Sequence, residues 1–283
     1  MSAGPALVLW ANPESGGGTD ADDLERRLTA LTARITRVED AGQLADAARG
    51  ADRIVVAGGD GSVAPAAEQA ARAGVPVAVV ATGTANDFAR AARLPVDLDG
   101  ACRLAVQGER VRSYELGRKD ARPFVNVCSA GLAVAAAGAA TSFKGALGPL
   151  AYAVGALRAG LKADPIECAV ACDGRAFFAG SAWQVVIACT GAFGGGSEIG
   201  VADPRDGELD VAVIESGPRA HLLRHAYGLR AGHVTKQPGV RHARGSEVEF
   251  DGEAAFNLDG EITEPTARAS FRVEPGAFDL VIG

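Results

Sequence analysis

The first part of the chain, up to about residue 115, alternates short apolar runs with stretches of helical periodicity. The expected strands cover 6–12, 35–38, 53–58 and 75–81, and the expected helices cover 20–34, 41–50, 62–74, 86–94 and 96–108. A strand that is followed by a helix and then by another strand favours parallel pairing. The alternation therefore predicts an α/β domain built on an open, mostly parallel sheet with helices on both faces.

Beyond this part the pattern changes to closely spaced strands with turn residues between them. The expected strands cover 110–116, 124–132, 166–174, 183–191, 208–215, 246–252, 255–261, 269–274 and 278–283, and helices are expected at 146–162 and 218–231. We predict an α/β domain over 1–118 and a second, mainly β domain over 119–272. A final strand at 273–283 follows, for which a return to the first domain is an option.

Composition is typical of a soluble globular protein. The chain has 283 residues, of which 48% are apolar and 22% charged, and its net charge of −7 argues against a nucleic-acid partner. The five cysteines form no CxxC pair, a usage typical of buried thiols in a reducing cytoplasm. The longest uncharged stretch, 124–143, carries polar residues and many alanines and favours a strand and a helix over a membrane span. We expect a cytoplasmic protein whose membrane contact is at most peripheral.

A glycine-rich stretch, Gly58-Gly59-Asp60-Gly61-Ser62, follows the third expected strand. Its glycines can adopt backbone angles closed to other residues and leave room for a ligand. A helix that begins near Ser62 would direct free N–H groups at an anion such as phosphate. The Asp60 carboxylate would repel phosphate unless it binds Mg²⁺ or a group of the nucleotide other than the phosphates. The alternative interpretation is a plain turn in which Asp60 caps the helix.

Two more polar loops follow expected parallel strands. The first is NPESGGG at 12–18, and the second is TGTANDF at 82–88. Each is also compatible with an ordinary loop that ends in a helix cap. Because the carboxyl ends of parallel strands lie at one edge of a sheet, we expect both loops to meet the glycine stretch there, where open α/β sheets bind ligands.

Five motifs in order resemble the diacylglycerol-kinase-type lipid kinases, especially the small bacterial members. They are NPESG at 12–16, GGDGS at 58–62, GTANDFAR at 83–90, GGGSEIGVADPRDGELD at 194–210 and LDGE at 258–261. The resemblance covers nearly the whole chain. It implies an NAD-kinase-like α/β nucleotide domain and a C-terminal β-sandwich domain, with the active site in the cleft between them. It also implies that ATP and Mg²⁺ serve as cofactors.

The resemblance implies which residues bind the nucleotide. Most of them lie in the three loops described above, and Thr36 is the nearest match to a threonine that precedes the glycine strand in the family. The implied set is Asn12, Pro13, Ser15, Gly16, Thr36, Gly58, Gly59, Asp60, Gly61, Ser62, Thr82, Gly83, Thr84, Asn86 and Asp87.

The resemblance also implies a structural Mg²⁺ at the DGELD segment. The expected ligands are the Asp206 carboxylate and main-chain carbonyls of Asp203 and Glu208, with Asp210 in support of the loop. Gly200 and Glu208 depart from the family, which has a proline and a leucine there. Without the resemblance, the residues themselves favour a polar turn before a strand.

The catalytic residues implied by the resemblance are Glu261, Asp259 and Asp60. A kinase needs an acceptor for the proton of the attacking hydroxyl, and Asp259 and Glu261 are the candidates. On an extended strand these two carboxylates would share a face. A turn at Gly260 would break that geometry, and a hairpin turn with exposed acids is the alternative interpretation.

Residues 216–246 contain no acid, but they contain six Arg or Lys residues and all four histidines of the chain. In a protein of net negative charge this asymmetry predicts a peripheral contact between residues 219–244 and anionic membrane lipid, against the alternative of a solvated helix and loop.

The expected function is transfer of the γ-phosphate of ATP to a lipid hydroxyl, with diacylglycerol or a related lipid as the acceptor. One alternative is a kinase like NAD kinase or phosphofructokinase, and the other is a nucleotide-binding regulator without catalysis. The sequence leaves the identity of the lipid open. It also leaves open the choice between Asp259 and Glu261, and the oligomeric state, for which a dimer is an option.

Overall fold

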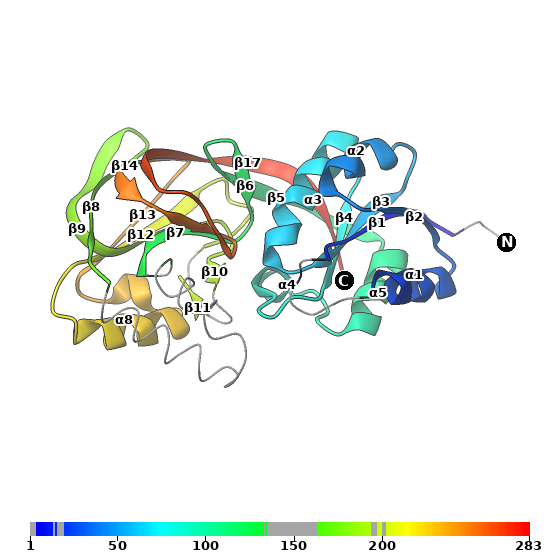
Figure 1. Cartoon of the computed structure of the whole chain (residues 1–283), viewed down its shortest axis with the longest axis horizontal. Helices are drawn as coiled ribbons and strands as arrows, with labels where there is room; N and C mark the ends of the chain where they lie inside the picture. Colours follow the sequence, from blue (N-terminus) through cyan, green and yellow to red (C-terminus); the bar gives the residue numbers. More distant parts are fainter. Residues whose placement is uncertain are drawn as a thin grey trace. The chain divides into compact units, whose positions relative to one another are not determined.

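The computed structural model describes residues 4–13, 15, 20–132, 134, 163–193, 197–199 and 202–283. The chain divides into two compact units (Figure 1). The first unit consists of Met1–Leu116, Pro204–Gly207 and Glu274–Gly283, and the second consists of Gly117–Asp203 and Glu208–Val273. The expected helix at 146–162 lies outside the described residues.

The first unit is built on a parallel sheet. Its strands are β1 (Ala6–Ala11), β2 (Arg34–Val38), β3 (Arg53–Gly58), β4 (Val77–Ala81) and the last part of β17 (Thr266–Ile282). They are ordered β17-β4-β3-β1-β2, with Leu280 of β17 beside Val77 of β4. The open parallel sheet expected from the alternating pattern is confirmed.

Helices cover both faces of this sheet, with α2 and α3 on one face and α1 and α5 on the other (Figure 1). Their bounds are α1 (Ala21–Ala30), the 3₁₀ turn η1 (Ala41–Gln43), α2 (Leu44–Ala47), α3 (Asp60–Ala73), α4 (Asp87–Ala91) and α5 (Leu98–Gln107). Leu24 and Leu28 of α1 pack against Leu7 and Leu9 of β1, and Val281 of β17 belongs to the same core. Apolar alternation on the strands thus supplies side chains to both helical layers.

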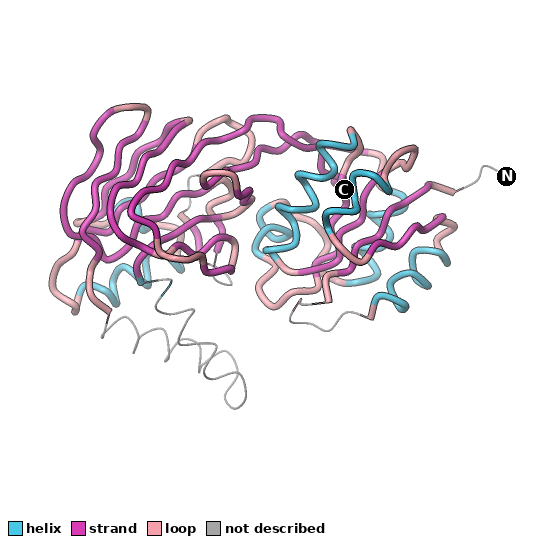
Figure 2. Tube along the Cα trace, turned by 45° about the horizontal axis from the view of Figure 1, so that its top comes forward, coloured by secondary structure: helices cyan, strands magenta, loops and turns pink. Residues whose placement is uncertain are grey.

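The second unit is built mainly of strands, drawn in magenta in Figure 2. These strands are antiparallel in all their described pairings. Its strands are β6 (Arg122–Phe124), β7 (Val127–Gly131), β8 (Ile166–Cys172), β9 (Arg175–Ala188), β12 (Leu209–Glu215), β13 (Val240–Gly245), β14 (Glu247–Ala254), β15 (Phe256–Leu258) and β16 (Glu261–Ile262). The short strands β10 (Ala192–Phe193) and β11 (Ser197–Glu198) pair separately. The strand β5 (Arg110–Lys119), like β17, runs from one unit into the other.

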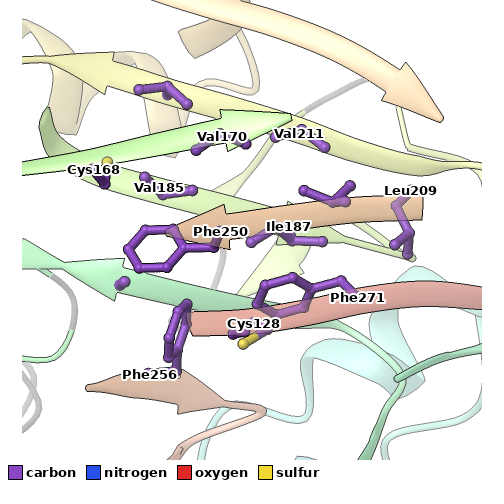
Figure 3. Packing of buried hydrophobic residues seen from close by; sticks show 14 of the residues in the cluster. Cys128, Cys168, Val170, Val185, Ile187, Leu209, Val211, Phe250, Phe256 and Phe271 are labelled. Carbon is purple, nitrogen blue, oxygen red and sulfur yellow. The ribbon is translucent and has the colours of Figure 1, made fainter. Parts of the chain in front are cut away.

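Strand β9 organises this unit because it pairs along its first half with β8 and along its second half with β7 and β12. Side chains from these strands and from β14 and β17 enclose one apolar core (Figure 3). Phe256 stands edge-on to Phe250, with ring centroids 5.1 Å apart, and lies 5.6 Å from the ring of Phe271. This core supplies the rigid support for the loops at the ends of its strands.

The structure corrects several expected elements. The expected strand at 124–132 is interrupted at Val125 and Asn126, because a carboxylate takes the N–H groups of both residues. The expected strands at 269–274 and 278–283 are one strand, β17, in which Pro275-Gly276 introduces a local kink, with Gly276 at φ 58°, rather than a turn. Strand β13 was not expected, because Arg241, His242 and Arg244 leave no alternating apolar pattern in it.

Helix α8 (His221–Arg230) and the 3₁₀ turn η2 (Val234–Lys236) cover Trp183 and Ile214 of the second unit. His225 is 4% exposed, and its Nδ1 lies 2.9 Å from Oε1 of Gln237. In the described part of the chain, no helix has the length and apolar character needed to cross a bilayer.

We expect protonation of His225 to destabilise the second unit. Burial lowers the pKa of His225, although the hydrogen bond with Gln237 opposes the shift. The unfolded chain then binds more protons than the folded chain as the pH falls through about 6.5, so the free energy of unfolding decreases from pH 7 towards pH 5. Urea titrations of His225→Gln should show a weaker decrease. The same titrations of His233→Gln, a change at an exposed ring, should follow the parent, and an unchanged slope in His225→Gln would refute the explanation.

Candidate functional site

The glycine stretch forms the junction between β3 and α3. Gly58 is the last residue of β3, Gly59 is the N-cap, and α3 begins at Asp60 rather than near Ser62. The three glycines do not use the backbone angles that are closed to other residues, because none of them has a positive φ. Space is the reason for glycine here. A Cβ atom on Gly83 would lie 2.6 Å from the Cα of Gly59, so the two loops approach each other backbone to backbone.

Asp60 connects this junction to the third loop. Its Oδ1 accepts a hydrogen bond of 2.8 Å from the backbone N–H of Phe88. Phe88 is in the first turn of α4, where N–H groups have no partner within the helix. Asp60 therefore holds the beginnings of α3 and α4 together, and its position in the first turn of α3 explains why a carboxylate is tolerated there.

The three expected loops do come together in the first unit. Asn12 donates from Nδ2 to Oγ of Ser62 at 2.9 Å, which ties the first loop to α3. The hydroxyls of Ser15 and Thr82 are 3.4 Å apart, which brings the first loop to the third. In addition, the N–H of Thr82 donates to the carbonyl of Gly58 at 2.9 Å. The carboxyl ends of β1, β3 and β4 thus carry one connected polar edge.

Asn86 leaves a polar atom at this edge available for a ligand. It is the N-cap of α4 with left-handed angles of φ 53° and ψ 43°, and its Oδ1 is buried without a hydrogen-bond partner among the described residues. A buried acceptor of this kind is costly unless something donates to it. The amino or hydroxyl groups of a nucleotide are suitable donors, and the close approach of Gly59 and Gly83 leaves backbone N–H groups unobstructed by side chains. These residues fit a nucleotide.

Not every expected nucleotide residue lies at this edge. Thr36 is in the middle of the edge strand β2, level with Val8 and with Ile54, which is four residues before the end of β3. Pro13 and Thr84 are exposed on their loops, Asp87 is 5% exposed, and Gly16 lies outside the described residues. Thr36 is therefore the one described member of the expected set that the sheet places away from the loops.

A buried acid that the sequence did not indicate, Glu115, forms hydrogen bonds with the loop that was expected to bind Mg²⁺. Oε2 of Glu115, a residue 1% exposed on β5, accepts from the N–H of Gly207 at 3.0 Å. The N–H of Glu115 donates to the carbonyl of Pro204 at 3.0 Å. The only sequence signal for this role is that Glu115 stands between Tyr114 and Leu116 in a strand, which is a weak indication of a buried acid. Both bonds shape the turn around Asp206, with Gly207 at φ 76°.

The donors near this turn fit Mg²⁺ only in part. Asp206 is exposed and Asp203 is half-buried, whereas the Glu208 side chain pairs with Arg244 at 3.1 Å. The described residues contain no group of three or more His, Cys, Asp or Glu side chains that could hold a metal ion. A site here would need main-chain carbonyls beside the carboxylate of Asp206, which Mg²⁺ accepts as oxygen ligands.

Asp210, at the end of the same segment, is fully buried and bonds elsewhere. Its Oδ1 lies 2.6 Å from Nε2 of His242, and its Oδ2 lies 3.5 Å from Nε of Arg244. Both partners belong to β13, so Asp210 connects β12 to β13.

Asp259 and Glu261 do not share the face of a strand. Asp259 and Gly260 form the turn between β15 and β16, with φ of 47° and 103°. The Asp259 carboxylate accepts from the backbone N–H groups of Val125, Asn126 and Val127 at 2.7, 3.0 and 2.9 Å. Glu261 projects from β16 with 60% of its side chain exposed and pairs with Arg122 at 2.9 Å. The Asp259 carboxylate is thus bound by the backbone, and Glu261 is the more exposed of the two acids.

Removal of the Asp259 carboxylate should destabilise the second unit. Asp259→Ala leaves three partly buried N–H groups without their acceptor, and bonds of this kind to a charged group contribute about 1.5–3 kcal/mol each. We expect a loss of at least about 4 kcal/mol in the free energy of unfolding, measured by urea titration. Asp251→Ala, which removes a 63% exposed carboxylate, is the matched control and should change stability by less than about 0.5 kcal/mol. Equal stability of the two variants would contradict the assignment.

Both halves of the chain match models of known protein families. Residues 6–118 match the model of the diacylglycerol kinase catalytic domain, and residues 126–282 match the YegS C-terminal NAD kinase beta sandwich-like domain. The diacylglycerol kinase of Staphylococcus epidermidis is 27% identical over 219 residues, which cover 74% of this chain and 68% of that protein. The diacylglycerol kinase of Staphylococcus saprophyticus is 25% identical over 219 residues, covering 74% and 70%.

Solved structures share the fold. A diacylglycerol kinase from Bacillus anthracis aligns with a TM-score of 0.76 at 20% identity, covering 100% of this chain and 99% of that one. An NAD kinase from Archaeoglobus fulgidus in complex with ATP aligns with a TM-score of 0.55 at 14% identity, covering 98% and 93%. The expected combination of an NAD-kinase-like first domain and a β-sandwich second domain is confirmed. With family models matched over residues 6–118 and 126–282, the chain belongs to the diacylglycerol kinase catalytic-domain family.

Proposed function

We propose that the protein is an ATP- and Mg²⁺-dependent lipid kinase that transfers the γ-phosphate to the hydroxyl of diacylglycerol or a related lipid. Family membership supports a phosphotransferase, and relatives named diacylglycerol kinase support a lipid acceptor. The observation that carries the proposal is the connected edge formed by the three loops, with its unpartnered acceptor on Asn86.

The nucleotide is assigned to the first unit. Backbone N–H groups at the start of α3 face the phosphates, since Gly58, Gly59 and Gly61 leave them uncovered. The acceptor on Asn86 orients the nucleotide, and Asn12, Ser15, Ser62 and Thr82 hold the loops in place. Asp60 is assigned to the Mg²⁺–nucleotide, and Asp206 with neighbouring main-chain oxygens to a structural Mg²⁺. Bound Mg²⁺ would neutralise phosphate charge as it develops in the transition state.

The acid is assigned to the second unit. Glu261 accepts the proton of the lipid hydroxyl as that oxygen forms a bond with the γ-phosphorus and the bond from phosphorus to the β–γ bridging oxygen breaks. The products are a phosphorylated lipid and ADP. Asp259 does not touch the substrate in this scheme. It positions Glu261 by fixing the turn between β15 and β16 to the backbone at 125–127.

The cytoplasmic face of a membrane is the place where such an enzyme finds both ATP and its lipid. Five free and buried cysteines agree with a reducing compartment. We therefore propose this location together with the lipid acceptor. The proposed reaction does not depend on whether the protein is a monomer or a dimer.

An acceptor screen tests the proposal. The full chain is incubated with labelled ATP and Mg²⁺ and, in turn, with diacylglycerol, sphingosine, phosphatidylglycerol, undecaprenol and NAD. We expect labelled lipid with diacylglycerol or a related acceptor, and no label when EDTA is added. Labelled NADP would replace the proposal with an NAD kinase. Nucleotide binding without a labelled product from any acceptor would favour a regulator.

A further inference from the structure

The acid-free segment 216–246 uses part of its positive charge internally. Arg241 forms an ion pair with Glu215, and Arg244 pairs with Glu208. Each acid lies outside the segment in sequence but next to it in the sheet, since β12 pairs with β13. The charges of these two arginines are therefore balanced within the second unit and are not available to a partner.

Further basic residues of this segment lie on the solvent side of α8 and on η2. Leu222 and His225 of the helix are buried, whereas His221, Arg224 and Tyr227 recur every third residue and are exposed. Tyr227 is 75% exposed, an unusual degree for a large aromatic side chain. These three side chains form a stripe along the solvent side of α8, which is the gold helix of Figure 1.

Lys236 extends this stripe. It is exposed on η2, which packs beside α8, and the guanidinium of Arg224 donates to the carbonyl of Pro238 at 3.1 Å, only two residues from Lys236. Within the described residues, neither Arg224 nor Lys236 has an acidic partner. We call the set of His221, Arg224, Tyr227 and Lys236 the α8–η2 face.

We infer that the α8–η2 face binds the headgroups of anionic lipids and holds the enzyme on its substrate membrane. Uncompensated basic side chains are attracted to an anionic surface, and tyrosine favours the boundary between headgroups and acyl chains. In a chain of net charge −7, a local basic and aromatic face is the part that such a surface would attract rather than repel. The inference rests on the proposed function for the statement that this membrane contains the enzyme's lipid substrate. The charge and the exposure of the α8–η2 face do not depend on that function.

Vesicle sedimentation of the full chain tests this inference. Vesicles of phosphatidylcholine alone are compared with vesicles that also contain phosphatidylglycerol, each at low and high salt. We expect binding only to the anionic vesicles, with a strong decrease at high salt, because exposed charges are screened beyond a Debye length. Binding that ignores lipid charge or salt, or the absence of binding to every vesicle, would overturn the inference.

Variants locate the surface. The double variant Arg224→Ala with Lys236→Ala should reduce the partition coefficient on anionic vesicles by about 5-fold for each charge, or about 25-fold together. Tyr227→Ser should also weaken binding without a change in the salt dependence. The matched control is Arg49→Ala with Arg103→Ala, which removes the same charge from exposed positions of the first unit and should bind like the parent. Equal losses in the two double variants would show a net-charge effect and would also overturn the inference.

Kinase assays separate this inference from the proposed function. With a short-chain diacylglycerol dispersed in detergent, the α8–η2 variants should phosphorylate at the parental rate, and only their activity on anionic vesicles should fall. A loss in both assays would mean that the face acts in the site itself instead of on the membrane. If no acceptor is phosphorylated, the proposed function fails, while sedimentation still decides the membrane contact.

Discussion

Glu261→Gln is expected to lower kcat for lipid phosphorylation by about 10²–10⁴-fold, because an amide cannot take the proton of the attacking hydroxyl. The side chain keeps its size and its position on β16, and 60% of it is exposed, so little packing is lost. A transition-state role predicts equal decreases in kcat and kcat/KM, with KM for ATP nearly unchanged. Steady-state assays with labelled ATP and diacylglycerol measure all three quantities.

The control for this change is Glu264→Gln, the same substitution three residues later at another exposed position, which should retain parental activity. Arg122→Gln adds a second comparison, since it removes the partner of Glu261 and leaves the carboxylate in place. Full activity in Glu261→Gln, with the fold intact by circular dichroism, would remove Glu261 from the mechanism.

Asp60→Asn is expected to lower kcat by at least about 100-fold, because the proposed metal–nucleotide complex would lose a negatively charged ligand. The substitution keeps an oxygen that can accept from the N–H of Phe88, so the link between α3 and α4 is retained. Asp60→Ala removes both the charge and the acceptor. The loss common to the two variants measures the chemical role, and the additional loss in Asp60→Ala measures the structural one.

Asp97→Asn provides the matched control for Asp60. Asp97 also stands at a helix N-terminus of the first unit, where its Oδ1 accepts from the N–H of Gly100 at 2.7 Å, a bond that stays within its own helix. It should retain activity and change stability by no more than about 1 kcal/mol. An Asp60→Asn enzyme that works as well as Asp97→Asn would show that Asp60 serves structure alone.

The fold of the first unit could be predicted because its signals are local. Val-rich runs such as 53–58 end in glycine and are followed by alanine-rich helices, so strand order along the chain and parallel pairing follow from periodicity. In the second unit the signals are weaker. The strand β13 carries Arg241 and Arg244 where apolar residues would be expected, and only acids on other parts of the chain explain why they are tolerated.

The part of the candidate site that lies at the ends of the parallel strands could be predicted from the sequence. Three loops at the ends of β1, β3 and β4 must meet, and their polar residues do. The acids at 259–261 could not be placed in advance, since the pattern fits both an extended strand and a turn. Three N–H groups at 125–127, more than a hundred residues away in sequence, decide for the turn.

The last strand has a consequence for biosynthesis. Leu280 and Val281 are completely buried in the first unit, yet the ribosome makes them after residues 117–203 and 208–273, which form the second unit. The first sheet therefore remains one strand short during most of translation, and the edge of β4 stays open to wrong partners. The second unit can finish folding first. A truncation after residue 274 would consequently disturb the first unit of the protein rather than the second unit, although the removed residues follow the second unit in the chain.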